Sequence, residues 1–125
     1  MPGWKIGYNG KNGVSNGQYG PWFTGECKNL DKACSVYGLQ GLELDCPIVV
    51  FGGDYIRDNG KWKARGSKYE YDVRKNTYKD PAAIVENNHR VLLTRARREM
   101  IILIPDDKKL NETYQYFVDM GMDIL

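Results

Sequence analysis

Two short stretches of this chain, Ser35–Asp45 and Arg90–Arg98, carry the residue types that can do chemistry. The first holds a Gly-Leu-Gln-Gly turn followed by two carboxylates, Glu43 and Asp45, which point the same way if the segment is extended. Such carboxylates can accept hydrogen bonds from a ribose or orient arginines opposite, or they are surface carboxylates of an ordinary turn. Gly41 allows a backbone shape that side chains forbid and lets a ligand approach closely.

The second stretch places four arginines at the end of an apolar helix predicted over residues 80–97. Arg97 and Arg98 lie on its polar side, where cations in a last turn meet the negative end of the helix dipole. Arg95 falls inside the apolar arc, where an arginine must find an anion or project past the core edge. A guanidinium matches the geometry of phosphate, and an internal carboxylate from the first stretch is the alternative partner.

The elements that must position these residues alternate between strands and helices, which favours an α/β fold. A short strand is predicted over residues 33–37, and Ile48–Phe51 has the continuous apolar pattern of a strand buried on both faces of a parallel sheet. A second buried strand follows over 99–104, and the helix between them, opened by an Asp-Pro pair, is a crossover candidate. A final helix, ended by Gly121, is predicted over 108–120, with its apolar side formed by Leu110, Tyr114, Phe117 and Val118.

Two polar regions accompany this framework. Residues 1–32 are a loop-rich lead-in with Asn-Gly turns, expected to pack on a domain formed by residues 33–125, with a short hairpin as one option. Its aromatic side chains can serve as a stacking platform for bases or simply cover one edge of the domain. Residues 54–78 are a basic insertion whose Asp58-Asn59-Gly60 turn predicts a β-hairpin or an extended loop.

Composition limits the function classes. The chain of 125 residues fits one domain, and its charge of +2 is too small for wholesale wrapping of nucleic acid, so basic function must be local to Arg90–Arg98. The sequence has no apolar run long enough for a membrane span and no apolar core of a signal peptide. Cys27, Cys34 and Cys46 form no CxxC pair and indicate reduced thiols in the cytoplasm. Zinc needs a fourth ligand, and His89 is the one histidine, so no metal site is expected.

Both stretches resemble helicase motifs. Ser35–Asp45 resembles motif V of superfamily 1 helicases in its Gln-Gly-x-Glu-x-Asp form, and Val91–Ala96 resembles their motif VI, a Val-Ala-x-Thr-Arg-Ala helix. A further resemblance is to the DUF2075 group of Schlafen-like DNA/RNA helicases, through the segments Gly53-Asp54, Asp58–Trp62 and Asn87–Arg95. Together these resemblances cover roughly residues 33–104.

The resemblance implies the second RecA-like domain of a motor, a parallel-sheet half-domain of the P-loop NTPase type. ATP and Mg²⁺ would then be bound mainly by an N-terminal RecA-like domain of the same parent protein, which supplies the phosphate loop. Arg95 would reach the γ-phosphate as an arginine finger, Gly41 would keep the turn tight by the γ-phosphate, and Glu43 would contact the nucleotide sugar. Ser35 and Tyr37 would lie near the path of the nucleic-acid strand.

The chain contains no Gly-x-x-x-x-Gly-Lys-Ser/Thr loop, so it is expected not to hydrolyse ATP alone and to be a shortened piece of a helicase or the product of a truncated gene. Its expected partners are ATP, single-stranded or duplex nucleic acid and the first motor domain, and no membrane. The alternative is a non-enzymatic module that binds single-stranded nucleic acid through the insertion and Arg90–Arg98. A third reading is a structural adaptor in which Arg95 has only an internal carboxylate partner.

Overall fold

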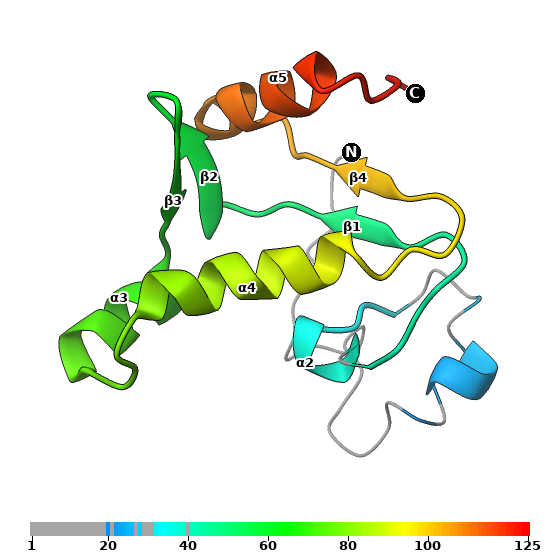
Figure 1. Ribbon diagram of the computed structural model, residues 1–125, viewed down its shortest axis with the longest axis horizontal. Helices are drawn as coiled ribbons and strands as arrows, with labels where there is room; N and C mark the ends of the chain where they lie inside the picture. Colours follow the sequence, from blue (N-terminus) through cyan, green and yellow to red (C-terminus); the bar gives the residue numbers. More distant parts are fainter. Residues whose placement is uncertain (1–19, 21, 27, 29–31, 40) are drawn as a thin grey trace. The chain divides into compact units, whose positions relative to one another are not determined.

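The computed structural model describes residues 20, 22–26, 28, 32–39 and 41–125 (Figure 1). The chain divides into two compact units, Met1–Glu43 and Leu44–Leu125, each described here by itself. The Asn-Gly turns predicted in the lead-in, the option of a hairpin there, and Cys27 lie outside the described residues. Within the described part of the chain, no helix has the length and apolar character needed to cross a membrane.

The described part of the first unit contains two short helical turns. These are η1, a single π-helical turn at Trp22–Glu26, and α2, a short α-helix at Val36–Leu39. The strand predicted over 33–37 is therefore wrong over most of its length, because only Ala33 makes a β-bridge. The amide of Gly38 donates to the carbonyl of Ser35 at 3.0 Å, so a local turn replaces the extended pairing that the apolar pattern predicts.

The second unit mixes strands and helices along the chain. Its elements are, in order, β1 (Ile48–Val50), β2 (Tyr55–Asp58), β3 (Lys61–Ala64), α3 (Ser67–Lys75), α4 (Pro81–Leu93), β4 (Ile101–Leu103), the 3₁₀ turn η2 (Lys108–Leu110) and α5 (Asn111–Asp119). β1 and β4 pair in parallel with Val49 opposite Ile102, and α4 lies in the connection between these strands. The predicted α/β order with two parallel strands around a helix is confirmed for this unit.

The two faces of β1 differ in burial. Val49 is 5% exposed and faces the core, whereas Ile48 and Val50 are 42% and 37% exposed. Successive side chains of a strand point to opposite faces, so β1 has one buried and one exposed face. The prediction of burial on both faces is wrong because the described sheet has only one well-covered face.

β2 and β3 form the hairpin that the Asp-Asn-Gly turn predicts. They pair antiparallel across Asn59 and Gly60, whose φ angles of 52° and 75° are both positive, as a type I′ turn requires. The carboxylate of Glu112 in α5 accepts the amides of Asn59 at 2.9 Å and Gly60 at 2.7 Å. Helix α5 therefore holds the tip of the hairpin. The helix α3 that follows the hairpin is absent from the sequence-based prediction.

The helix ends show both agreement and error. Asp80 caps α4 by accepting the amide of Ala83 at 3.1 Å, which confirms the predicted start. The predicted final helix is confirmed as η2 followed by α5, and Gly121, with φ of 89°, lies just beyond its end. Tyr114 was expected on the apolar side but is 44% exposed, whereas Thr113 is fully buried.

An aromatic cluster forms the core of the second unit. Phe51 is 1% exposed, and its ring centroid lies 5.3 Å from Phe117 of α5 and 5.1 Å from His89 of α4. Partly buried side chains pack against the cluster of Val49, Phe51 and Phe117; they are Tyr55, Trp62, Leu92, Leu93, Met100, Ile102, Ile104 and Tyr116. The sheet, the hairpin, α4 and α5 thus share one core, as their arrangement in Figure 1 indicates.

Candidate nucleotide and nucleic-acid site

Arg95 lies just past the end of α4. The helix ends at Leu93 with Thr94 as its C-cap, so the predicted helix to Arg97 and the helical-wheel position of Arg95 are both wrong. The Arg95 side chain folds back over the last turn: Nε donates to the Val91 carbonyl at 3.2 Å and Nη2 to Thr94 Oγ1 at 3.4 Å. A cation in this position complements the negative end of the helix dipole, and the Arg95 side chain remains partly exposed.

The helix ends here because the chain turns to pair with the first motif. The Leu44 amide donates to the Arg95 carbonyl and the Arg97 amide donates to the Leu44 carbonyl, both at 2.8 Å. This arrangement is a parallel bridge between Leu44 and Ala96. The carbonyl of Asp45 accepts two further amides, from Arg98 at 3.1 Å and from Glu99 at 3.2 Å. The end of the first motif, Leu44 and Asp45, is therefore joined backbone to backbone with residues 95–99.

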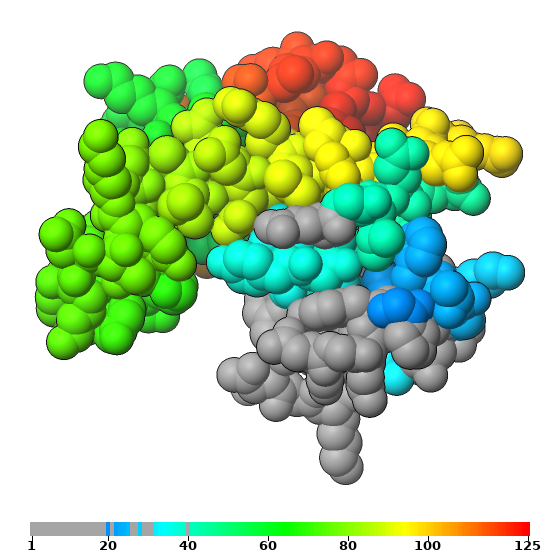
Figure 2. Space-filling view, turned by 60° about the horizontal axis from the view of Figure 1, so that its bottom comes forward, coloured from blue at the N-terminus to red at the C-terminus, as the bar shows by residue number. Residues whose placement is uncertain are grey.

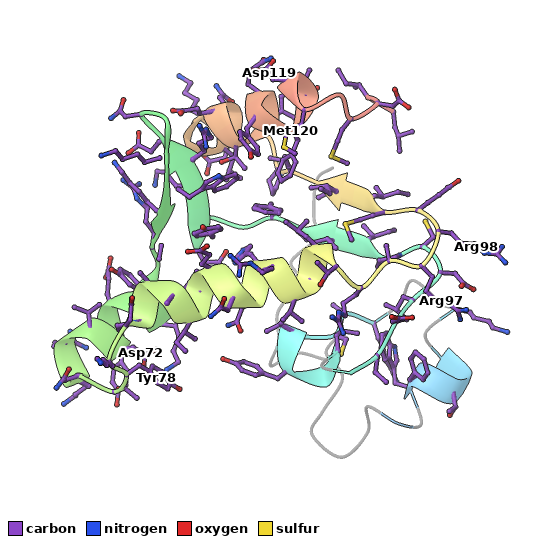
Figure 3. All side chains as sticks on the ribbon, viewed as in Figure 1. Asp72, Tyr78, Arg97, Arg98, Asp119 and Met120 are labelled. Carbon is purple, nitrogen blue, oxygen red and sulfur yellow. The ribbon has the colours of Figure 1, made fainter. Side chains whose placement is uncertain are left out.

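The junction of Leu44 with Ala96 lies at the amino ends of β1 and β4. Arg97 and Arg98 extend from the loop that leads from the junction into β4, and both are exposed (Figure 3). Neither lies in a last helical turn, so the predicted dipole role is wrong for both. Arg90 is the cation that α4 carries in its last turn, and it pairs with Glu86 at 3.1 Å.

The remaining candidate residues belong to the first unit. Ser35 precedes α2, and Tyr37 in α2 is 62% exposed. Gly41 has φ of 79°, the left-handed region that glycine adopts at little cost, and Glu43 is exposed. Burial raises the pKa of the neighbouring Cys34 thiol above its usual range.

Arg95 belongs to the second unit, and so do Leu44 and Asp45, the last two residues of the first motif. The structure therefore brings these three residues together. It describes Ser35, Tyr37, Gly41 and Glu43 separately, as parts of the first unit.

His89 serves the core. Its ring is 7% exposed, lies 4.8 Å from the Tyr55 ring and 5.1 Å from the Phe51 ring, and its Nδ1 is 2.9 Å from the Val85 carbonyl. Burial, followed by the negative charge of nearby Glu86, raises the pKa of Tyr55.

The described residues contain no group of three His, Cys, Asp or Glu side chains placed to hold a metal ion.

An open pocket lies at the other end of the sheet from Arg95. It has a volume of about 530 Å³ and is lined by Gly53, Ile56, Arg65, Gly66, Glu70, Asp107, Lys109 and Leu110. Gly53 follows β1 and Asp107 follows β4, so the pocket lies at the carboxyl ends of the parallel strands, where α/β sheets commonly bind ligands. Sequence reasoning missed the pocket because its lining depends on the unpredicted start of α3.

Residues 8–106 match the family described as Schlafen group 3, DNA/RNA helicase domain. The chain belongs to this family. The match includes both motif stretches and the insertion of residues 54–78, so the resemblance to helicases predicted from the motifs is confirmed at the level of a helicase family. No curated protein and no solved structure matches the chain. As a member of the Schlafen group 3 helicase-domain family, the chain has a helicase-related function in nucleic-acid metabolism.

Proposed function

We propose that the chain is the second RecA-like domain of a superfamily 1 helicase of the DUF2075 group, acting on DNA or RNA. In this proposal a first RecA-like domain of the same parent protein holds Mg²⁺ and most of the ATP phosphates. ATP supplies the phosphoryl group that is transferred to water. The present chain contributes positioned side chains and part of the strand-binding surface.

The backbone junction between the two motifs carries the proposal. Leu44 pairs with Ala96 and its amide donates to the Arg95 carbonyl, so a displacement of Leu44 and Asp45, the end of the first motif, must displace Arg95 as well. A motor that couples the state of its nucleotide to movement needs the arginine that contacts the nucleotide to be tied to neighbouring chain segments in this way. The membership of the Schlafen group 3 helicase-domain family supports the same conclusion.

Arg95 is the arginine finger in this proposal. Among its contacts, Nε donates to the Val91 carbonyl at 3.2 Å and Nη2 to Thr94 Oγ1 at 3.4 Å, both neutral acceptors. A guanidinium can make bidentate, charge-assisted hydrogen bonds to a γ-phosphate. Arg95 then stabilises the charge that spreads over the phosphoryl oxygens in the transition state.

Residues of the first unit complete the proposed assignments. Glu43 accepts hydrogen bonds from the nucleotide sugar. Gly41 keeps the turn tight beside the γ-phosphate, and its φ of 79° is a conformation that glycine adopts at little cost. Ser35 and Tyr37 contact the nucleic-acid strand, for which the exposed ring of Tyr37 offers a stacking face.

The proposal is tested by phosphate release from ATP in the presence of single-stranded oligonucleotide. The purified chain alone is expected to release none, and a protein that joins the first RecA-like domain to this chain is expected to turn over. Strand-stimulated hydrolysis by the chain alone would refute the assignment, and so would an inactive two-domain protein that folds and binds ATP.

A second candidate is a non-enzymatic module that binds single-stranded nucleic acid. The concentration of basic and aromatic side chains in the insertion favours it, since binding through that surface needs no nucleotide. This candidate predicts salt-dependent binding by the chain alone, together with a two-domain protein whose strand affinity does not depend on ATP. ATP-dependent strand affinity supports the motor instead.

A further inference from the structure

Exposed tyrosines and cations gather on α3 and the loop that follows it. Tyr71 is 46% exposed and Tyr78 is 41% exposed. The Lys68 ammonium lies 5.6 Å from the Tyr71 ring centroid and 5.9 Å from that of Tyr78, and the Arg74 guanidinium lies 5.9 Å from Tyr71. We call the group Lys68, Tyr71, Arg74, Lys75, Tyr78 and Lys79 the α3 surface; all six residues are exposed.

The Asp72 carboxylate fixes the position of Lys68 in the α3 surface. This carboxylate is 8% exposed, and its Oδ1 lies 2.6 Å from the Lys68 ammonium, one turn away. The pairing keeps the Lys68 ammonium within reach of both tyrosine rings, and Figure 3 shows Asp72 and Tyr78 where α3 gives way to α4. Because the surface is ordered before any partner arrives, binding loses less side-chain entropy.

The charge of this segment differs from that of the rest of the chain. Residues 65–79 contain five basic and two acidic side chains, a net charge of +3, whereas the whole chain carries +2. The other 110 residues therefore carry a net charge of −1. Residues 65–79 are thus a basic segment in addition to Arg90–Arg98, and α3 stands at one end of the second unit in green (Figure 2).

We infer that the α3 surface binds single-stranded nucleic acid, with bases stacked on Tyr71 and Tyr78 and phosphates held by Arg74, Lys75 and Lys79. The inference rests on the proposed function and adds a binding surface to it. Aromatic rings among cations are the pattern by which proteins hold single strands without reading their sequence. The faces of bases are open to such rings in single strands and closed in a duplex, and an acidic peptide offers no planar group to stack.

The α3 surface is separate from the proposed nucleotide contact. It adjoins the start of α4, whereas Arg95 follows the end of that helix. The 13 residues of α4 span about 20 Å, so bases on α3 and a nucleotide at Arg95 would lie at opposite ends of one rigid element. Movements of α4 that accompany nucleotide binding or hydrolysis at Arg95 would therefore displace a strand bound at α3.

The test is fluorescence anisotropy of the full 125-residue chain with labelled single-stranded DNA and RNA of about 16 nucleotides. Tyr71→Ala and Tyr78→Ala are each expected to weaken binding about 5-fold to 100-fold, while Tyr71→Phe keeps the affinity. Tyr114→Ala is the matched control, because Tyr114 is 44% exposed but lies on α5, and it is expected to change nothing. Lys75→Gln is expected to lower the slope of log affinity against log salt by about 1. DNA binding with no RNA binding, or the reverse, identifies the type of strand and supports the inference.

The inference is overturned if both alanine variants bind like the parent chain, or if Tyr114→Ala loses as much affinity as they do. It is also overturned if a duplex or polyglutamate binds more tightly than the single strand. Circular dichroism of each variant verifies its fold, and Tyr71→Phe separates loss of stacking from loss of structure. The assay contains no ATP, so the outcome is independent of whether the ATPase experiment supports or refutes the motor.

Discussion

Replacing Thr113 by valine is predicted to destabilise the second unit through the loss of one buried hydrogen bond. The two-residue turn makes Asp58 and Lys61 the hydrogen-bonded pair that closes the hairpin, so the Arg57 amide points away from β3. Thr113 Oγ1 accepts this amide at 2.9 Å from a side chain that is 0% exposed. Helix α5 thereby covers the open edge of β2 and satisfies its amide.

The expected magnitude follows from the shape of the side chain. Valine has nearly the volume of threonine, so Thr113→Val adds no cavity and leaves the Arg57 amide without its acceptor. An unsatisfied buried donor costs about 1–3 kcal/mol. For a chain of 125 residues, this loss lowers the melting temperature by about 4–12 °C.

Thermal unfolding followed by circular dichroism measures the effect. Thr94→Val is the control, since its hydroxyl contacts the Arg90 and Val91 carbonyls at an exposed helix end and its loss should cost less than about 0.5 kcal/mol. Equal melting temperatures for Thr113→Val and the parent chain would refute the reasoning, and so would an equal loss in both variants.

Two further predictions concern single residues of the second unit. The Lys63 ammonium, hydrogen-bonded to Asp58 at 2.8 Å, lowers the pKa of that carboxyl below its ordinary 3.8. The Asp58–Lys63 pair therefore stabilises the fold above about pH 4, and this stabilisation is lost as the pH falls through the lowered pKa. In urea unfolding, Asp58→Asn should lower the free energy of unfolding at pH 7 and lower it less as the pH falls. A loss that is independent of pH would contradict this prediction. Gly121→Ala forces a side chain into a φ of 89° and should cost about 1–2 kcal/mol in urea unfolding, although a Cβ there meets no described atom within 4 Å; an unchanged midpoint would show that α5 ends without strain.

Local signals predicted the parts of the fold that depend on a few neighbouring residues. Asp80 with Pro81 marked the start of α4, and Asn59 with Gly60 marked the hairpin turn, because cap and turn chemistry is decided within four residues. The parallel pairing of β1 with β4 followed from their continuous apolar runs and the helix between them.

Long-range contacts decided the parts that sequence reasoning missed. The apolar pattern of α4 continues to Ala96, but pairing with Leu44, far away in the chain, ends the helix at Leu93. Helix α3 has little apolar pattern to reveal it, since its buried residue is the charged Asp72. The spaced tyrosines of the insertion were a visible signal for the α3 surface, but their grouping depends on the helix.

The sequence identified candidate residues of the site but not how the chain positions them. The choice of Arg95 rested on a helical wheel that does not apply past Leu93, whereas the motif resemblance selected the same residue independently. The tie between Leu44 and Ala96 could not be predicted, because spacing along the chain does not reveal the register of a bridge between distant segments.

The most direct test of the central claim is the ATPase rate of Arg95→Ala in a protein that joins the first RecA-like domain to this chain. Removing an arginine finger is predicted to lower strand-stimulated kcat by about 10³-fold to 10⁵-fold, with ATP binding and the fold retained. Arg98→Ala, in the same loop but outside the proposed nucleotide contact, should keep nearly the full rate. A kcat for Arg95→Ala close to that of the parent protein would contradict the assignment of this domain to the motor.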